Sequence, residues 1–336
     1  MVSQGLKLLI GAGGIYTSFL TYGKLHEQIF KYEDPHGQRF VFAFFLQAIE
    51  ALANVVVALI GMKIVGQQKN LPVKLFVGAG VSQVLAKACT SLALANALSF
   101  PVVTLAKSGK MVPVMIGSIL LGGKSYSVKQ YVTVAAIIVG TVIVTLDQKK
   151  HGDKDQQDSM WGTFFILASL VLDGIVGGMQ ADIQKETKAR LGVSVAQFDM
   201  MFWTNIFMAM AAVVICCIPI DSTLSLVEPE FMRGLVFCVL NDAIWPKILL
   251  FALCSAVGQS FVFYSIANFD SLTTTTITTT RKVLSTLLSI FTEGHTMSAT
   301  GWAGLSVASA GICMEILEKT AGATEKKHSD DRLKAK

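Results

Sequence analysis

The sequence predicts an all-α integral membrane protein in which ten transmembrane helices form two inverted five-helix repeats. Hydrophobic residues make up 52% of the 336 residues and charged residues only 15%, whereas soluble globular chains carry about 25% charged residues. The charges gather in short segments between long apolar blocks, which is typical of a chain solvated by lipid. One polar linker divides these blocks five and five, and the two halves resemble each other.

A helix needs roughly 20 apolar residues to cross a bilayer. Ten blocks approach or exceed this length: Leu6–Tyr22, Val41–Val65, Leu75–Leu98, Val102–Leu121, Tyr131–Leu146, Trp161–Met179, Phe198–Ile220, Ile244–Phe269, Leu272–Phe291 and Ala299–Leu317. The links near Ser99–Pro101 and Asp270–Ser271 are very short, so the helices on either side of each link are expected to form tight hairpins.

The Lys and Arg residues between the blocks predict the orientation of the chain. If the N-terminus is cytosolic, fifteen of these residues face the cytosol and eight face the other side. Cytosolic loops carry an excess of Lys and Arg. Both termini are therefore expected in the cytosol, in agreement with an even number of spans.

The linker 147–160 separates a first repeat, 6–146, from a second, 161–317, and a basic tail, 318–336, follows. "ANALSFPVVTLAKSGKM" in the first half recurs in outline as "ANFDSLTTTTITTTRKV" in the second. An odd number of spans in each repeat inverts the second copy, and inverted repeats of this kind place a substrate site near their interface in many transporters. Chance resemblance between apolar helices is the alternative.

Five basic residues fall within the apolar blocks, namely Lys87, Lys107, Lys110, Arg281 and Lys282. Each costs about 2.5–3.5 kcal/mol at a helix centre, so four that face lipid would cost on the order of 10–14 kcal/mol. The acidic residues within the blocks are fewer: Glu50, Asp173 and Glu315, with Glu27 and Asp182 near block ends. Pairing with these acids, or snorkelling to the interface, is the simpler interpretation, but the excess of positive charge favours an anion in a membrane cavity.

Four of these cations are predicted to form one phosphate-binding site. Lys107 and Lys110 are three residues apart and share a helical face, and Pro113 loosens the helix beside them. The repeat alignment places Lys110 opposite Arg281 or Lys282. Arg can bind a phosphate through two hydrogen bonds while Lys acts as a point charge, so the set suits a diphosphate or triphosphate.

Other polar residues in the blocks have less specific interpretations. The run Thr273–Thr280 would line a polar path to Arg281, or its hydroxyls would bond the preceding helical turn. Lys87 would neutralise Glu50 or line the cavity. Glu27 is either an exposed end of the first span or a site residue. The Gly-rich "LDGIVGGMQADI" would permit close helix approach.

Two other classes of function fit the sequence less well. An enzyme acting on phosphate esters would need carboxylates or histidines near the cations, but all five histidines are expected in loops or the tail. The six cysteines show neither metal-ligand spacing nor a disulfide framework, and no cofactor is expected. A scaffold without transport would leave the buried cations unexplained. Nucleic acid is not expected as a partner, because no basic stripe alternates with aromatics.

The segment "SAVGQSFVFYSIANFDSLTTTTITTTRKVLSTLLSI" resembles the signature of nucleotide-sugar transporters in the drug/metabolite transporter superfamily. "LAKSGKMVPVM", "YGKLHEQI" and "LDGIVGGMQ" are similar to the endoplasmic-reticulum branch described as UDP-galactose transporter homologues, one of which is assigned as an ATP/ADP exchanger. The similarity runs from about Tyr22 to Leu317. Lys87 and Glu50 are additional charges that depart from the family pattern and leave the sugar and base open.

The resemblance implies ten helices and alternating-access antiport of a nucleotide sugar, UDP-galactose or UDP-glucose, against a nucleotide, or of ATP against ADP. It implies phosphate contacts at four residues and a cavity lined by others: Lys107, Lys110, Arg281 and Lys282 at the phosphates, and Glu27, Gln259, Tyr264 and, from the threonine run, Thr278 in the lining. The tail ends "DDRLKAK" and resembles a dilysine-type retrieval signal that coat proteins recognise. The expected location is therefore the endoplasmic-reticulum membrane, with the Golgi as second choice.

Overall fold

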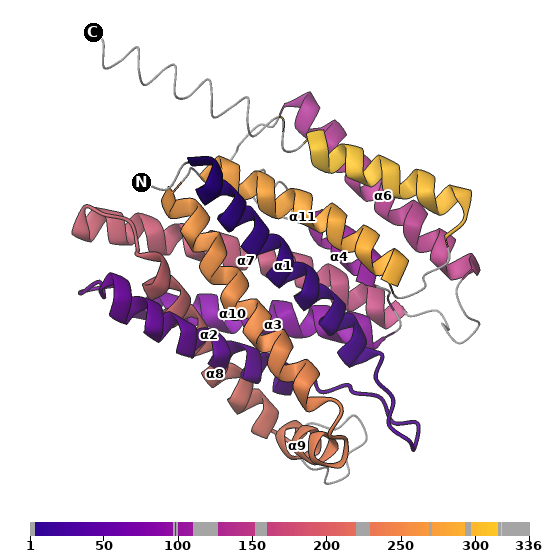
Figure 1. Cartoon of the computed structure of the whole chain (residues 1–336), viewed down its shortest axis with the longest axis horizontal. Coiled ribbons are helices and arrows are strands. Elements are labelled where there is room, and N and C mark those ends of the chain that lie inside the picture. The colour runs from indigo at the N-terminus through magenta and orange to yellow at the C-terminus, as the bar shows by residue number, and fades with distance from the viewer. Residues whose placement is uncertain are drawn as a thin grey trace. The chain divides into compact units, whose positions relative to one another are not determined.

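In the computed structural model, the regular elements of the described part of the chain are helices, joined by short loops (Figure 1). That part comprises residues 4–109 except 97 and 99, then 127–151, 160–219, 229–268, 271–292 and 297–317 except 315 and 316. The helices are α1 (Gln4–Phe30), α2 (Ala43–Val65), α3 (Val73–Ala95), α4 (Phe100–Ser108), α6 (Val128–His151), α7 (Met160–Leu191), α8 (Gln197–Cys217), α9 (Glu230–Leu240), α10 (Trp245–Asn268) and α11 (Ser271–Thr292). A last apolar helix covers Ala299–Met314.

Among the described residues, five helices are long and apolar enough to cross a membrane: Ala43–Val65, Val73–Ala95, Met160–Leu191, Gln197–Cys217 and Trp245–Val262. Two shorter apolar helices are Val128–Val144 and Ala299–Met314. α11 has 22 residues, but its threonines and two central cations make it less apolar. These helices agree with the predicted membrane protein. Each predicted apolar block overlaps one of the helices of the structure, although residues 110–121 of the fourth block lie outside the described residues.

The chain divides into two compact units, which are described separately. Unit 1 contains residues 1–16, 100–158 and 264–336, and unit 2 contains residues 17–99 and 159–263. Each unit therefore combines helices from both halves of the sequence.

In unit 2, α2 packs against α8, and α3 packs against both α7 and α8. Small residues allow this: a Cβ built at Gly80 of α3 would lie 2.8 Å from the backbone nitrogen of Met208 in α8. Between α3 and α7, the hydroxyls of Thr90 and Ser169 lie 2.8 Å apart, and Ser169 also donates to the Ala86 carbonyl at 2.8 Å. Van der Waals packing between closely approaching helices and interhelical hydrogen bonds drive helix association in lipid.

In unit 1, α4 packs against α11 and α6. α6 also meets the helix Ala299–Met314 so closely that a Cβ at Gly140 would lie 2.4 Å from the backbone nitrogen of Ala308. Asp147, 3% exposed, accepts hydrogen bonds from the backbone N–H of Ser298, at 3.0 Å, and from its hydroxyl, at the start of that helix. α6 thus continues to His151, and the first five residues of the predicted linker are helical.

The first helix also differs from its predicted block, because α1 continues to Phe30. The prediction that all histidines lie in loops or the tail is wrong for His26, which is 4% exposed within α1. Its Nε2 lies 3.1 Å from the Ser91 hydroxyl, and its ring contacts Phe251. Partners from other helices thus satisfy a polar residue that sequence alone placed outside the membrane.

The short helix α9 was not predicted. Its first residue, Glu230, accepts hydrogen bonds from the backbone N–H groups of Phe44 and Phe45 at 2.8 and 3.0 Å. These N–H groups belong to the first turn of α2, which has no side-chain cap of its own. α9 therefore anchors one end of α2.

Candidate functional site

Arg281 and Lys282 occupy the middle of α11. The helix runs from Ser271 to Thr292, so Arg281 lies ten residues after its start. At 1.5 Å per residue both cations are about 15 Å from either end of the helix. Both side chains are half-buried. If α11 crosses the membrane, the two charges lie near its centre, where a lipid-facing cation is unfavourable by about 2.5–3.5 kcal/mol.

Lys107 lies on the helix that packs against α11. It belongs to the last turn of α4 and is half-buried. The packing of α4 against α11 within unit 1 places the helices of Lys107 and Arg281 side by side. Lys110 lies outside the described residues.

Among the residues of unit 1 that the structure describes, acidic side chains are scarce. Asp147 is the one Asp or Glu among the residues that the structure describes in this unit. Both of its oxygens accept hydrogen bonds from Ser298, so its role there is to cap a helix. The described part of unit 1 therefore carries more basic than acidic side chains.

Hydroxyls cover much of α11 beside the cations. Thr278 is half-buried, and four other hydroxyl residues of this helix are buried: Thr279, Ser285, Thr286 and Ser289. Thr286 donates to the Lys282 carbonyl at 3.0 Å, a bond to the preceding turn. The buried Ser285 hydroxyl has no hydrogen-bond partner among the described residues. The polar face of α11 thus extends beyond the predicted threonine run.

The predicted cavity-lining residues fall in both units, and the two in unit 2 lie at different levels. Tyr264 belongs to unit 1, whereas Glu27 and Gln259 belong to unit 2. Glu27 is 2% exposed and pairs with Lys31 at 3.0 Å, so it is not an exposed helix end. A Cβ built at Gly258 would lie 2.8 Å from Phe19, which places Gln259 near the level of Phe19. Glu27 is eight residues further along α1, about 12 Å away.

Unit 2 contains a buried ion pair that connects three helices. The Lys87 ammonium of α3 lies 2.5 Å from Glu50 Oε1 of α2, and the Ser255 hydroxyl of α10 donates to the same oxygen at 2.6 Å. Glu50 is 0% exposed and Lys87 is 21% exposed. Of the two predicted roles for Lys87, the structure therefore supports neutralisation of Glu50.

The polar face of α2 around Glu50 was not recognised in the sequence. Gln47, Glu50 and Asn54 are all buried and lie three and four residues apart, on one helical face. Gln47 donates to Ser91 at 3.4 Å and Asn54 to Asn205 at 3.1 Å. The three- and four-residue spacing of these polar residues within an apolar block could have indicated a buried polar face. Their partners could not be predicted, because they come from other helices.

Among the described residues, no group of three or more His, Cys, Asp or Glu could hold a metal ion. The described polar side chains in the middle of α11 are cations and hydroxyls.

Comparison with known proteins shows related chains along nearly the whole sequence. A family model described as the UAA transporter family matches residues 7–319. The "Solute carrier family 35 member B1 homolog" of Drosophila melanogaster is 27% identical, over 96% of this chain and 94% of the relative. The "UDP-galactose transporter homolog 1" of Mycosarcoma maydis is 27% identical, over 98% and 99%. The human "Adenosine 3'-phospho 5'-phosphosulfate transporter 1" is 27% identical, over 93% and 70%.

Proposed function

The chain belongs to the UAA transporter family, and from this premise we propose that it exchanges a nucleotide sugar for a nucleotide by alternating access. The protein is a transporter and not an enzyme. The proposed nucleotide sugar is UDP-galactose or UDP-glucose. A relative named as a UDP-galactose transporter homologue supports this choice, since it covers almost the whole chain.

The observation that carries the proposal is the pair of cations in the middle of α11, beside α4 with Lys107. A substrate with two adjoining phosphates carries the opposite charge and enough oxygens to accept hydrogen bonds from Arg281 and the lysines. Lys107, Lys110, Arg281 and Lys282 are the proposed phosphate contacts. Binding would neutralise them, so that the loaded carrier changes face more easily than the empty one. This difference would couple the two substrates as an exchange.

Helix packing supports two inverted five-helix repeats, 6–146 and 161–317. In that arrangement α2 corresponds to α8, α4 to α11, and α6 to Ala299–Met314. Each of these three pairs is in contact within its own unit. Equivalent helices of inverted repeats meet where the pseudo-two-fold axis passes between them. Contacts between equivalent helices are therefore expected for two inverted copies of a five-helix repeat, ten helices in all.

The proposed location is the endoplasmic-reticulum membrane with both termini in the cytosol. The excess of Lys and Arg on one side supports the orientation. The basic tail 318–336 contains Arg332 and Lys334, and a coat protein is its proposed partner.

Counterflow into proteoliposomes tests the function. Purified protein is reconstituted into vesicles preloaded with UMP, and uptake of UDP-galactose, UDP-glucose, GDP- and CMP-linked sugars, ATP and ADP is compared. We expect uptake of the UDP-sugars to exceed that of the other substrates. Preferential uptake of ATP into ADP-loaded vesicles would instead assign the chain as an ATP/ADP exchanger of the same fold.

Substitutions in α11 test the site. We expect Arg281→Ala and Lys282→Ala to reduce exchange at least tenfold while the protein elutes as a folded monodisperse species. Lys129→Ala, which removes an exposed lysine from α6 in the same unit, is the matched control. Wild-type uptake by both α11 variants would refute the proposed phosphate contacts.

A further inference from the structure

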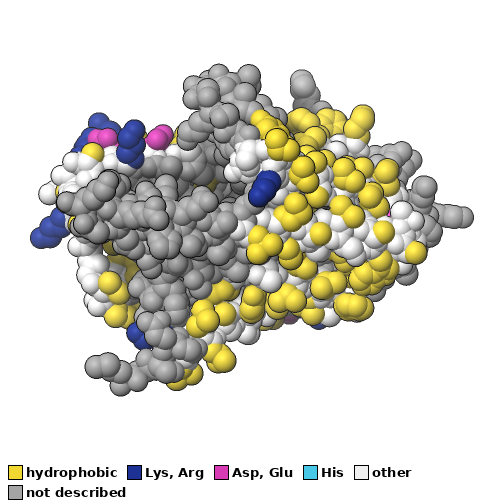
Figure 2. Space-filling view, turned by 90° about the horizontal axis from the view of Figure 1, so that it is seen from above, with side chains coloured by type: hydrophobic (Ala, Val, Ile, Leu, Met, Phe, Trp, Pro, Cys, Tyr) yellow, Lys and Arg dark blue, Asp and Glu magenta, His cyan; other side chains and the backbone are white. Residues whose placement is uncertain are grey.

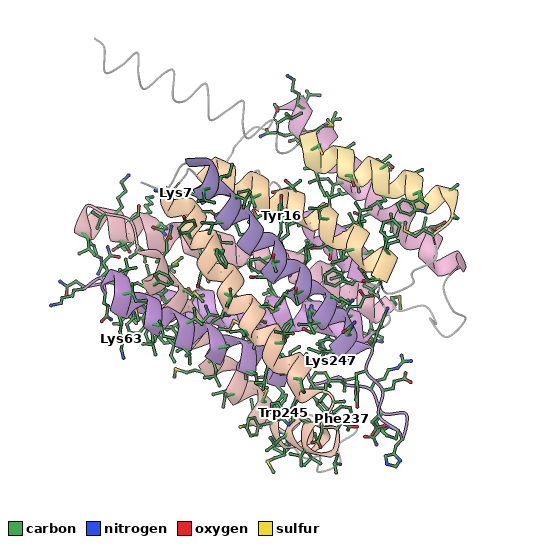
Figure 3. All side chains as sticks on the ribbon, viewed as in Figure 1. Lys7, Tyr16, Lys63, Phe237, Trp245 and Lys247 are labelled. Carbon is green, nitrogen blue, oxygen red and sulfur yellow. The ribbon has the colours of Figure 1, made fainter. Side chains whose placement is uncertain are left out.

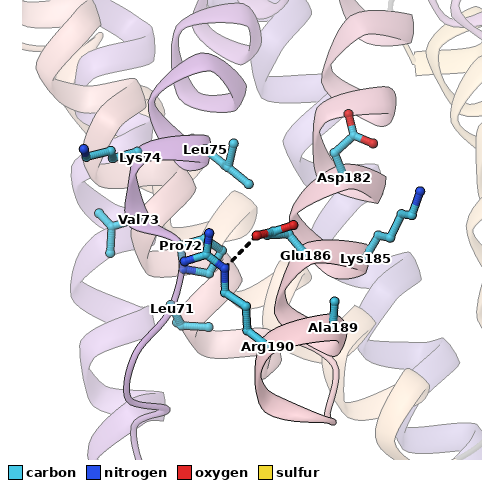
Figure 4. Close-up of a pocket in the computed structure, with 10 residues that line it drawn as sticks. All are labelled: Leu71, Pro72, Val73, Lys74, Leu75, Asp182, Lys185, Glu186, Ala189 and Arg190. Atoms are coloured by element: carbon cyan, nitrogen blue, oxygen red, sulfur yellow. Dashed lines mark hydrogen bonds and ion pairs between the residues drawn. The ribbon is translucent and has the colours of Figure 1, made fainter.

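A cavity of about 850 Å³ opens at one end of unit 2, between the start of α3 and the last turns of α7 (Figure 4). Five of its residues are charged: Lys74, Asp182, Lys185, Glu186 and Arg190. In Figure 4 the Arg190 guanidinium points across the gap toward Pro72, with Lys74 and Lys185 at opposite margins. None of these residues belongs to the proposed phosphate site in α11, which lies in the other unit.

The length of α7 sets the depth of this cavity relative to the bilayer. Trp161 and Phe164, near the start of α7, are 66% and 57% exposed and contact each other, as expected for aromatic residues at a membrane interface. From Trp161 to Asp182 the helix rises about 32 Å, close to the roughly 30 Å of a hydrocarbon core. The last turns of α7, with Lys185 and Arg190, therefore reach the level of the lipid headgroups.

Positive charge dominates this end of the unit. Residues 63–74 and 182–190 together contain six Lys or Arg and two acidic residues. α3 begins with no acidic residue in its first turn, and Pro72 provides no side-chain cap. The N-terminus of a helix carries partial positive charge and N–H groups that favour an anion. Figure 2 shows blue Lys and Arg side chains gathered with the acidic ones at the left of the view.

Arg190 forms an exposed ion pair on α7. Its Nε donates to Glu186 Oε1 at 2.6 Å, one helical turn earlier, and the two side chains are 59% and 43% exposed. The guanidinium is therefore accessible at the cavity, and such a group binds phosphate oxygens through paired hydrogen bonds. The loops on either side are fixed, since Gln68 bonds the Ser194 carbonyl at 3.2 Å and the Ala196 N–H at 2.8 Å. The cavity is therefore formed before any ligand binds.

Apolar side chains border the same charged end. Ile64 and Val65 at the end of α2 are 78% and 70% exposed, and Leu75 and Val77 on α3 are 42% and 43% exposed. Lys63 lies beside them near the end of α2, as Figure 3 shows. A soluble anion would use only the charges, whereas a phospholipid would use both the charges and this apolar border.

We propose that this cavity binds the headgroup of an anionic phospholipid, with the phosphate at Arg190 and the start of α3 and the acyl chains along the exposed apolar residues of α2 and α3. Lys74 and Lys185 attract the net negative charge of the headgroup. The site is independent of the transported substrate. Its position in the cytosolic leaflet, where anionic lipids are abundant, rests on the orientation given under Proposed function.

Native mass spectrometry of the purified protein tests the site. Phosphatidylserine and phosphatidylcholine with identical acyl chains are titrated against the wild type and against the double variant Lys185→Gln/Arg190→Gln. One basic residue near a membrane surface contributes about fivefold to anionic-lipid affinity, so we expect the double variant to bind phosphatidylserine about 30-fold more weakly. Phosphatidylcholine has the same phosphate but no net negative charge, so its binding should weaken less than that of phosphatidylserine.

Lys188→Gln is the matched control, because Lys188 is exposed on the same helix but does not line the cavity. We expect this variant to keep the wild-type preference for phosphatidylserine. Equal affinity of the wild type for both lipids, or an equal loss in Lys188→Gln and the double variant, would overturn the proposal. So would glycerophosphoserine, the headgroup without acyl chains, binding as tightly as the whole lipid, since that result identifies a site for soluble anions.

Discussion

Replacing Lys87 with Met should destabilise unit 2 much more than replacing its partner Glu50 with Gln. Glu50 is 0% exposed and its Oε1 receives both the Lys87 ammonium, at 2.5 Å, and the Ser255 hydroxyl, at 2.6 Å. Its other oxygen, Oε2, is buried without a hydrogen-bond partner among the described residues. Loss of Lys87 would leave a buried carboxylate with one neutral donor.

The magnitude follows from this geometry. Removing one partner of a buried ion pair costs about 3–5 kcal/mol, because the other charge remains buried without compensation. At roughly 2 °C for each kcal/mol in a chain of this size, Lys87→Met should lower the unfolding midpoint by about 6–10 °C. Glu50→Gln leaves an ammonium on a side chain that is 21% exposed and can turn outward, so we expect about half that loss.

The double variant Glu50→Gln/Lys87→Met completes the cycle, and it should be more stable than Lys87→Met alone because no charge remains buried. Thermal unfolding followed by tryptophan fluorescence in detergent measures all four proteins, with Lys188→Met as the exposed-lysine control, expected within about 0.5 kcal/mol of wild type. Single effects that add within about 0.5 kcal/mol would show that the two residues do not interact. A larger loss from Glu50→Gln than from Lys87→Met would refute the argument from burial.

Two further predictions concern a helix contact and a helix cap. Gly140→Ala should destabilise the protein by about 1–3 kcal/mol, because its Cβ would lie 2.4 Å from the backbone nitrogen of Ala308. Gly178→Ala is the control and should not destabilise the protein, since its Cβ would meet no described atom within 4 Å. Equal unfolding midpoints for the two variants would contradict this prediction. Burial raises the pKa of Glu230 above the usual 4.5, so its contribution to the free energy of unfolding falls as pH rises from 4.5 through the raised pKa. Thermal unfolding between pH 4.5 and 7 should therefore show a smaller decrease with pH in Glu230→Gln than in wild type, and parallel curves would contradict this.

The apolar helices could be located from the sequence because hydropathy alone determines where a chain can lie in lipid. α2 and α10 begin and end within two residues of their predicted blocks. α1 was predicted to end at Tyr22 because Lys24, His26 and Glu27 look like loop residues. All three are helical. His26 is buried against Ser91 and Glu27 is buried with Lys31 as its partner, and hydropathy takes no account of such partners.

The same limit applies to close helix contacts. The glycines of "LDGIVGGMQADI" suggested a tight helix contact, but a Cβ at Gly177 or Gly178 would meet no described atom within 4 Å. The tight contacts occur instead at Gly80 and Gly140, which stand in ordinary apolar surroundings in the sequence. Glycine permits a close approach, and only the position of the neighbouring helix decides whether one occurs.

Unit 2 shows how this fold holds an intramembrane lysine. Lys87 has a carboxylate placed for it by a neighbouring helix of unit 2, with a serine from a third helix completing the arrangement. In the described part of unit 1, the one acidic residue caps a helix through Ser298, while Arg281 and Lys282 stand in the middle of α11 among hydroxyls. Within unit 2, the Glu50 carboxylate thus neutralises the Lys87 ammonium. Arg281 and Lys282, with Lys107 on the adjoining α4, are the cations that the exchange assay tests as phosphate contacts, because a guanidinium can bind two phosphate oxygens at once.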